Sequence, residues 1–166
     1  MRKAFLALVL SAALLFSLSG CGGFLNLFGG DKTGSIGAEM KTEWFAFVVE
    51  SAKIVPEYEG YTPESGNMLI DVVVTETNTF DSTLPMFDSD FVLQDSSESF
   101  VFSLDPFHGS MMPLEFDLAV GETVTYHVVF EVPDSSSGFS LVYLEEYTDT
   151  TGNEGTGSTF TVELGI

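Results

Sequence analysis

From Trp44 to the C-terminus, apolar residues recur at every second position along most of the chain, which is the period of a β-strand. The clearest segment is 123–132, which begins after Gly121-Glu122 and ends at Pro133-Asp134. Its alternate positions form an apolar face of Val124, Tyr126, Val128, Phe130 and Val132, and a largely polar face that includes Thr123, Thr125, His127 and Glu131. Outside the N-terminal 20 residues, no segment of ten or more residues has an apolar stripe with a period of 3.6. The sequence therefore predicts an all-β protein.

Further segments show the same pattern between clusters of Gly, Pro, Asp and Ser, and each is expected to form a strand. They are residues 44–49 continuing through 52–55, 68–77, 91–94, 100–104, 141–147 and 159–164. In the last of them, the residues expected to face inward are Phe160, Val162 and Leu164. About seven to eight short strands separated by turns predict an immunoglobulin-like antiparallel β-sandwich. Periodicity alone leaves a closed barrel open as the alternative.

The N-terminus has the features of a bacterial lipoprotein signal peptide. Arg2-Lys3 precedes an apolar run of 15 residues, 4–18, which is shorter than the roughly 20 residues needed to span a bilayer. Leu18-Ser19-Gly20-Cys21 resembles a lipobox, and Cys21 is the only cysteine. We expect residues 1–20 to be removed and Cys21 to carry a thioether-linked diacylglycerol, with an ordinary signal or an uncleaved anchor as the alternative. The predicted location is the extracytoplasmic face of a bacterial cell membrane.

A glycine-rich segment follows the lipobox. Residues 21–42 contain six glycines and are predicted to be a lipidated, flexible tether. Within this tether, Phe24-Leu25-Asn26-Leu27-Phe28 is too short for a stable amphipathic helix, so it is interpreted either as an interfacial anchor or as a spacer. The globular domain is predicted to cover residues 43–166. Because the only cysteine is committed to lipid, the fold must rest on its apolar core rather than on a disulfide.

The mature chain is strongly acidic. Without residues 1–20 it has three lysines, no arginine and 25 aspartates and glutamates, which gives a formal net charge of −22. We expect no binding to nucleic acid, because that affinity comes from Lys and Arg side chains that displace counterions from phosphates. Anionic lipid headgroups would also repel the domain, so membrane attachment is expected to depend on the lipid.

Several short motifs occur in an order that resembles the DUF4352 family of telokin-like, immunoglobulin-like domains of bacterial surface lipoproteins, which is related in fold to the secreted mycobacterial antigen MPT63. The motifs are Trp44-Phe45, Tyr58-Glu59-Gly60-Tyr61, Thr75-Glu76-Thr77-Asn78-Thr79, Pro85-Met86-Phe87, Asp90-Phe91, Gly121-Glu122-Thr123 and Val129-Phe130-Glu131-Val132-Pro133. The resemblance covers roughly residues 43–164. It implies an immunoglobulin-like sandwich on the outer face of a Gram-positive type membrane and implies no enzymatic role. Asn78, where a strand runs into a loop, is expected to close an Asx turn.

Residues that could support catalysis are sparse. Only His108 and His127 could titrate near neutral pH, and His127 falls on the polar face of its predicted strand. Ser110 follows His108 by two residues, but no Gly-x-Ser-x-Gly motif is present, and proximity in sequence does not make a catalytic triad. No P-loop, dinucleotide-binding or zinc-protease motif occurs in the sequence. We therefore expect no enzymatic activity and no cofactor.

Calcium binding is the one metal chemistry that the composition suggests. The hard oxygen ligands that Ca²⁺ prefers could come from Asp81, Asp88, Asp90 and Asp95. The spacing of an EF-hand loop is missing, so a solvated acidic face is the simpler interpretation. A Ca²⁺ or small-ligand site in the region 81–95, in an accessory lipoprotein, remains the alternative function.

Loop residues with large apolar side chains suggest a different function. They lie beside Gly, Pro or Asp and are Tyr58, Tyr61, Met86, Phe87, Phe107, Met111 and Met112. If they gather at one end of the sandwich, they would form an exposed patch for protein recognition; otherwise they would close the open ends of the sandwich. The favoured hypothesis is a lipid-anchored, non-catalytic module that binds a protein or another envelope component through its loops or an exposed sheet edge.

Overall fold

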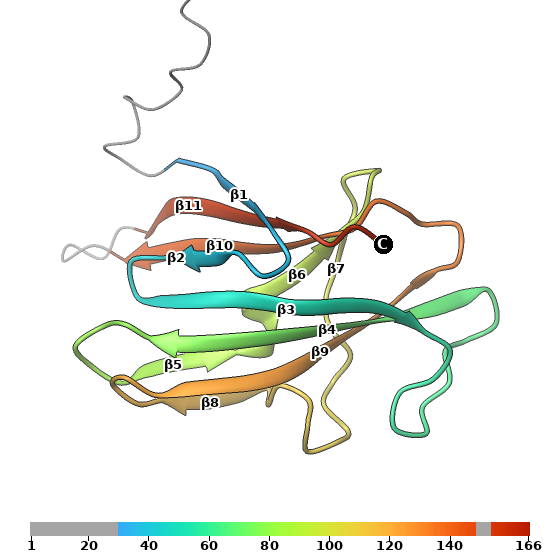
Figure 1. The fold of residues 1–166 in the computed structure, drawn as a ribbon, viewed down its shortest axis with the longest axis horizontal. Helices are drawn as coiled ribbons and strands as arrows, with labels where there is room; N and C mark the ends of the chain where they lie inside the picture. Colours follow the sequence, from blue (N-terminus) through green and yellow to red (C-terminus); the bar gives the residue numbers. More distant parts are fainter. Residues whose placement is uncertain (1–29, 149–153) are drawn as a thin grey trace, which may run out of the picture.

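The computed structural model describes residues 30–148 and 154–166. These residues contain eleven β-strands and one short helical turn, η1 (Figure 1). The elements in chain order are β1 (Lys32–Ser35), β2 (Glu39–Lys41), β3 (Phe45–Val55), β4 (Asn67–Asn78), β5 (Leu84–Phe87), η1 (Asp88–Asp90), β6 (Phe91–Gln94), β7 (Phe100–Val101), β8 (Glu115–Leu118), β9 (Thr123–Pro133), β10 (Ser140–Thr148) and β11 (Glu154–Glu163). The all-β prediction is confirmed.

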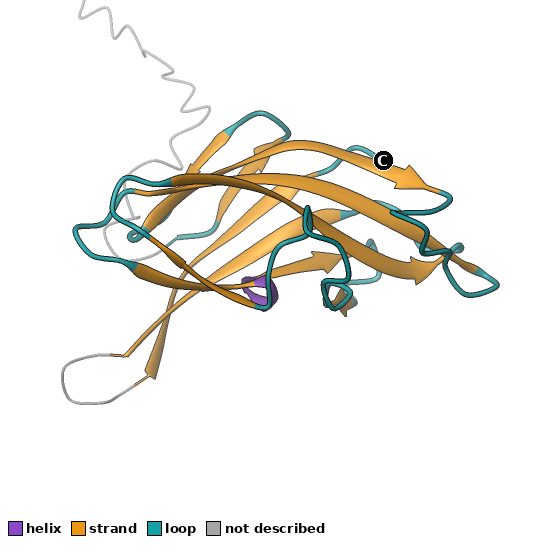
Figure 2. Cartoon of the chain, turned by 90° about the horizontal axis from the view of Figure 1, so that it is seen from below, coloured by secondary structure: helices purple, strands orange, loops and turns teal. Residues whose placement is uncertain are grey.

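The strands form two packed sheets and a small two-stranded ribbon, as Figures 1 and 2 show. The first sheet has the order β1-β11-β10-β6-β7, the second has the order β2-β3-β4-β9, and β5 pairs with β8. Neighbouring strands are antiparallel except β1, which runs parallel to β11. The predicted immunoglobulin-like β-sandwich is therefore confirmed, with more strands in the described residues than the seven or eight expected.

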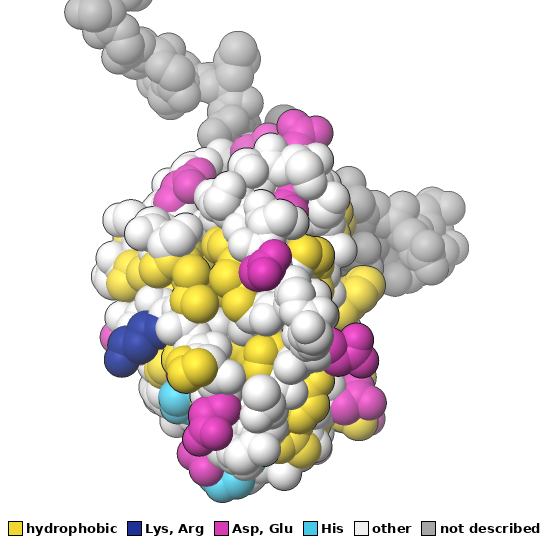
Figure 3. All heavy atoms as spheres, turned by 90° about the vertical axis from the view of Figure 1, so that its right-hand side faces the viewer, with side chains coloured by type: hydrophobic (Ala, Val, Ile, Leu, Met, Phe, Trp, Pro, Cys, Tyr) yellow, Lys and Arg dark blue, Asp and Glu magenta, His cyan; other side chains and the backbone are white. Residues whose placement is uncertain are grey.

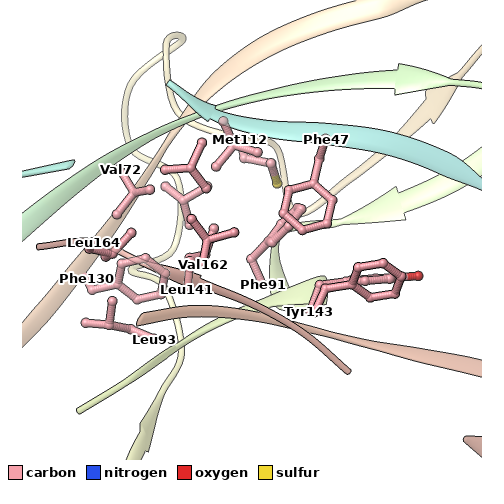
Figure 4. Close-up of a cluster of buried hydrophobic side chains, with 14 of the residues drawn as sticks. Phe47, Val72, Phe91, Leu93, Met112, Phe130, Leu141, Tyr143, Val162 and Leu164 are labelled. Atoms are coloured by element: carbon pink, nitrogen blue, oxygen red, sulfur yellow. The ribbon is translucent and has the colours of Figure 1, made fainter. Parts of the chain in front are cut away.

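The main core lies between the two sheets. Ile70 of β4 pairs with Phe130 of β9, and both side chains are fully buried. Leu141, Val162 and Leu164 belong to the same buried cluster, and Figure 4 shows Phe130 among them. The inward-facing residues predicted for the segments 123–132 and 159–164 are thus confirmed.

A second, smaller apolar cluster covers the opposite, outer face of β4 and β9. Leu69 and Val129 point to this side and are completely buried. Tyr58 and Met111, which come from loops, are buried against them. The outer cluster explains why these two strands carry apolar residues on both faces instead of a strict alternation.

The folded domain begins at Lys32 and not at residue 43 as predicted. β1 pairs with β11 from the opposite end of the chain, and Met40 of β2 is buried in the main core. Gly34 permits this packing, because a Cβ atom at that position would lie 2.7 Å from the sulfur of Met40. The prediction of a flexible tether over residues 21–42 is therefore wrong from residue 32 onward. The two strands are short and mostly polar, so their sequence carries no alternating signal.

Other strand boundaries differ in informative ways. The break predicted between residues 49 and 52 is a shift in the pairing of β3 with β4, between Val49 and Ser51. The predicted strand 100–104 ends at Val101, because Leu104 donates its backbone N–H to Val129 of the other sheet. Strands β5 and β8 are absent from the sequence prediction.

The predicted signal peptide, Cys21 and the segment 24–28 lie outside the described residues. Within the residues that the structure does describe, no helix has the length and apolar character needed to cross a membrane.

Candidate functional site

The seven loop residues predicted as a recognition surface do not form one exposed patch. Met86 and Met112 are buried in the main core, and Tyr58 and Met111 are buried in the outer cluster. The loops fold back over the sheets and cover apolar residues that the strands leave exposed. For these four side chains the exposed-patch hypothesis is wrong, and closing the sandwich is their role.

The loop between β3 and β4 is fixed to the outer face of β9. The hydroxyl of Tyr61 donates to Glu131 at 2.5 Å, and Glu131 also accepts from the side chain of Asn67 at 2.7 Å and the backbone N–H of Glu64 at 2.8 Å. These hydrogen bonds, that from Tyr61 first, lower the pKa of the Glu131 carboxyl. The exposed ring of Phe107 packs against Tyr61 with 5.3 Å between ring centroids. Tyr61 and Phe107 therefore belong to two loops that pack against each other.

His108 and Ser110 do make contact. Nδ1 of His108 lies 2.8 Å from the hydroxyl of Ser110, which also shares a hydrogen bond of 2.8 Å with the hydroxyl of Tyr58. On the other side of the ring, Nε2 of His108 lies 3.6 Å from a carboxylate oxygen of Glu59. That separation exceeds hydrogen-bond distance, so Glu59 does not orient the imidazole as a catalytic triad requires. These contacts hold the loop between β7 and β8 in place and do not activate Ser110 as a nucleophile.

His127 is not a solvated strand residue as its position suggested. Its Nδ1 atom lies 2.7 Å from Oδ1 of Asp71 on the neighbouring strand, and the ring of Tyr58 lies 5.5 Å away between centroids. The side chain is partly buried beneath the loops. His127 therefore ties the outer cluster to the sheet.

The four aspartates proposed as calcium ligands do not converge on one point, and Asp88, Asp90 and Asp95 accept hydrogen bonds from different partners. Asp95 accepts hydrogen bonds from residues of its own turn, which lower its pKa, and Asp90 accepts the backbone N–H three residues before it. Asp88 accepts from the hydroxyl of Ser103 at 2.9 Å, and Asp81 is exposed. Among the described residues, no three His, Cys, Asp or Glu side chains are arranged to hold a metal ion. The structure does not bring these aspartates together.

Millimolar Ca²⁺ is therefore expected to leave the thermal midpoint of the mature protein nearly unchanged. A ligand at 100 times its dissociation constant would stabilise the fold by about 2.7 kcal/mol, which would raise the midpoint by several degrees. Screening of the net charge can also raise the midpoint, so NaCl at matched ionic strength is the control. A Ca²⁺-specific rise that disappears in the Asp88→Asn, Asp90→Asn double variant would establish the calcium site.

An open groove lies on the outer face of the first sheet, and we call it the sheet-face groove. It has a volume of about 560 Å³ and is lined by Ser89, Asp90, Val92, Phe100, Phe102, Val142, Leu144 and Thr159. The volume falls in the range of roughly 300–1,000 Å³ that is typical of ligand pockets. The groove is therefore large enough to hold a small ligand or side chains of a partner.

The alternation of β10 explains the floor of the groove. Leu141 and Tyr143 face the main core, so Val142 and Leu144 must face outward. At the edge of the same sheet, the side chains of Phe100 and Phe102 remain 58% and 66% exposed. The groove is thus an apolar sheet face next to an edge strand, and not a gap between loops.

The basic residues of the described chain lie elsewhere. Lys32 lies over the ring of Phe160, 4.6 Å from its centroid, and Lys41 pairs with Glu39 at 3.0 Å. No lysine lines the sheet-face groove, whereas Asp90 does. Figure 3, a view from the right-hand side of Figure 1, shows acidic side chains spread around apolar areas at that end of the sandwich, with a basic side chain at its margin. The groove therefore favours cationic partners over anionic ones.

Comparison with known proteins identifies the fold. No family model and no curated protein matches the chain. Among solved structures, the yjhA protein of Bacillus subtilis is 18% identical, with a TM-score of 0.57 over 79% of this chain and 98% of its own. The secreted protein MPT63 of Mycobacterium tuberculosis is 14% identical, with a TM-score of 0.57 over 78% of this chain and 96% of its own.

A candidate lipoprotein of Bacillus subtilis, ycdA, is 18% identical, with a TM-score of 0.55 over 75% of this chain. The present chain spans only 38% of the length of ycdA. At these identities the likeness concerns the fold alone. The fold relationship to MPT63 expected from the sequence motifs is found, whereas membership of the DUF4352 family is not shown.

Proposed function

We propose that this protein is a lipid-anchored, extracytoplasmic protein whose β-sandwich binds another protein and performs no catalysis. The observation that carries the proposal is the sheet-face groove, where Phe100, Phe102 and Leu144 remain exposed beside one another. Single exposed apolar residues are common on protein surfaces, but a group that lines a hollow of this size marks a binding site. The lipobox at Cys21 supports the anchor. The ycdA and MPT63 proteins, of the same fold, support the location.

The negative net charge of the chain limits the classes of partner that can bind to it. A second copy of the mature chain would carry the same net charge of −22, and that repulsion opposes self-association through a groove that itself contains Asp90. Anionic lipid surfaces are disfavoured for the same reason. The best-fitting partner is a protein segment that offers apolar side chains to the groove and Lys or Arg side chains to Asp90 and its surroundings.

An affinity capture from the cell envelope tests this proposal. The immobilised mature protein should retain a specific envelope protein, and Phe102→Ala should reduce the amount retained by about tenfold or more, since a few aromatic anchors dominate most interfaces. Phe107→Ala is the matched control, because Phe107 is also an exposed phenylalanine but lies over the outer cluster. A partner retained equally by both variants would show that the groove is not the binding surface.

The anchor makes a separate prediction. Cys21→Ser should abolish metabolic labelling of the protein with fatty acid and move it from the membrane to the soluble fraction. Acyl chains contribute about 0.8 kcal/mol per buried CH₂, and the acidic domain offers no compensating attraction to anionic lipids. Ser35→Thr, which lies outside the lipobox and keeps the thiol, is the control. Fatty-acid labelling that persisted in Cys21→Ser would rule out this anchor.

A further inference from the structure

A second open hollow lies beside η1 and differs in character from the sheet-face groove. Its volume is about 220 Å³, and its lining includes Trp44, Phe45, Phe87, Tyr143 and Asp90. The rings of Phe45 and Tyr143 are buried and meet edge to face, 5.0 Å apart between centroids. Trp44 is half-buried and Phe87 is exposed. We call this hollow, with four aromatic rings and one carboxylate in its wall, the aromatic cleft.

The groups of the aromatic cleft are held in place by contacts that do not depend on a ligand. Trp44 packs edge to face against Phe80 with 5.0 Å between ring centroids. A carboxylate oxygen of Asp90 accepts the backbone N–H of Phe87 at 2.9 Å, which keeps the carboxylate next to an exposed ring. Figure 4 shows Tyr143 at the margin of the core cluster, with its hydroxyl directed away from the cluster. The cleft is therefore preorganised.

Aromatic rings combined with a carboxylate are the chemistry that recognises an organic cation. The face of each ring carries partial negative charge, and a cation within about 6 Å of a ring centroid gains roughly 0.5–2 kcal/mol. The carboxylate of Asp90 adds a full negative charge. An anion would be repelled by the chain, and a neutral apolar group would gain nothing from the carboxylate.

A buried carboxyl group close to the floor of the cleft is a second feature that favours a cation as the ligand. Phe45 pairs with Asn78, so Glu76, two residues earlier on β4, is a diagonal neighbour of Phe45 on the inner face of the sheet. Glu76 is only 1% exposed, and neither of its carboxyl oxygens has a hydrogen-bond partner in the structure. Buried polar groups without partners are rare and are commonly explained by a missing water or ion. A cation in the cleft would stabilise the ionised form of this carboxyl group.

We infer that the aromatic cleft binds an alkylammonium cation, either a free quaternary ammonium compound or the end of a lysine side chain from a protein. Phe45 and Tyr143 would form the floor against the alkyl groups, and Asp90 would pair with the charge. A hollow of 220 Å³ is smaller than most pockets for drug-sized molecules, so it fits one head group or side-chain end. The inference goes beyond the proposed function, because the aromatic cleft is a different site from the sheet-face groove. Of the residues that line the two, only Asp90 is common to both.

The sequence offers a direct reporter, because Trp44 is the only tryptophan. Choline chloride titrated into the mature protein carrying Cys21→Ser should give a saturable change in tryptophan fluorescence. The neutral isostere of choline, in which carbon replaces nitrogen, and NaCl at matched ionic strength should give none. A parallel titration with Nα-acetyl-lysine amide separates the two sources of the cation: the tighter of the two probes identifies the natural class of ligand.

Two variants test the assignment of residues. Phe87→Ala and Asp90→Asn should each weaken choline binding by about tenfold. Phe102→Ala, which changes an exposed phenylalanine of the groove, should leave choline binding unchanged, so the cleft and the groove are tested independently. Circular dichroism confirms that each variant is folded. Absence of saturation in the parent protein, an equal response to the neutral isostere, or unchanged affinity in both cleft variants would overturn the inference.

Discussion

Replacing Phe130 by alanine is expected to lower the free energy of unfolding by about 3–5 kcal/mol, the range measured when a buried phenylalanine is truncated. Phe130 lies at the middle of β9, pairs with Ile70 and is completely buried between the two sheets. Removal of the ring would leave a cavity that the paired strands cannot close. Because domains of this kind have total stabilities of about 5–15 kcal/mol, the variant is expected to be close to unfolding.

Thr125 provides the matched control on the same strand. Its side chain is exposed, and its hydroxyl shares a hydrogen bond of 2.9 Å with Thr75 across the strand pair. Thr125→Ala should therefore cost less than about 1 kcal/mol. Urea denaturation of both variants measures the difference. Equal midpoints would contradict the observed division of β9 into a core face and a solvent face.

The strands that the sequence reveals are those in which inward apolar residues alternate with polar ones over most of their length. In β11, and in β9 except at Val129, the inward residues alternate largely with polar residues, so the pattern identifies both the strand and the side that faces the main core. Asn78 is a similar local success: its side-chain oxygen accepts the backbone N–H of Phe80 at 2.8 Å, which closes the predicted Asx turn. Each of these features depends only on residues that are close in sequence.

Features that depend on distant pairing were not predictable in this way. β1 is polar and pairs with β11, which lies more than a hundred residues later in the chain, so no local sequence pattern predicts it. Met86 and Met112 look like loop residues beside Pro, yet Met86 lies on strand β5 and both side chains are buried in the main core. Loop position therefore does not distinguish a recognition residue from one that closes the sandwich.

The sheet-face groove had a weak signal in the sequence. Phe100 and Phe102 are two residues apart and so share one face, while Val101 between them packs toward the core. The sequence alone does not reveal whether the face with the two phenylalanines or the face with Val101 is buried. The high exposure of Phe100 and Phe102 in the structure shows that this face points to solvent.

Glu76 is the clearest departure from the sequence pattern. It occupies an inward position on β4, in line with Val72 and Val74, where an apolar residue is expected. Burial, and to a lesser extent the nearby charge of Asp90, raises the pKa of its carboxyl group from 4.5 to about 8. At neutral pH the side chain is therefore mainly protonated in the folded protein and ionised in the unfolded chain.

The sign of the resulting pH dependence follows from proton binding. Between pH 4.5 and pH 8 the folded state holds a proton that the unfolded state has lost, so the free energy of unfolding falls as the pH rises through this window. Each pH unit is worth about 1.4 kcal/mol, so the loss is on the order of 4 kcal/mol by the upper end. The lowered pKa values of Glu131 and Asp95 act in the opposite direction and remove stability as the pH falls.

Glu76→Met isolates the contribution of Glu76, because Glu131 and Asp95 are present in both proteins and cancel in the difference. The variant is expected to be more stable than the natural protein, with a gap that widens by about 1.4 kcal/mol per pH unit between roughly pH 5 and pH 8. Glu76→Gln should show the same change in the gap with pH, although its buried amide makes the variant less stable than Glu76→Met. Urea denaturation at three pH values within this window measures the slope. A gap that stayed constant across the window would mean that Glu76 keeps an ordinary pKa, and that a partner for its carboxylate exists in the folded protein.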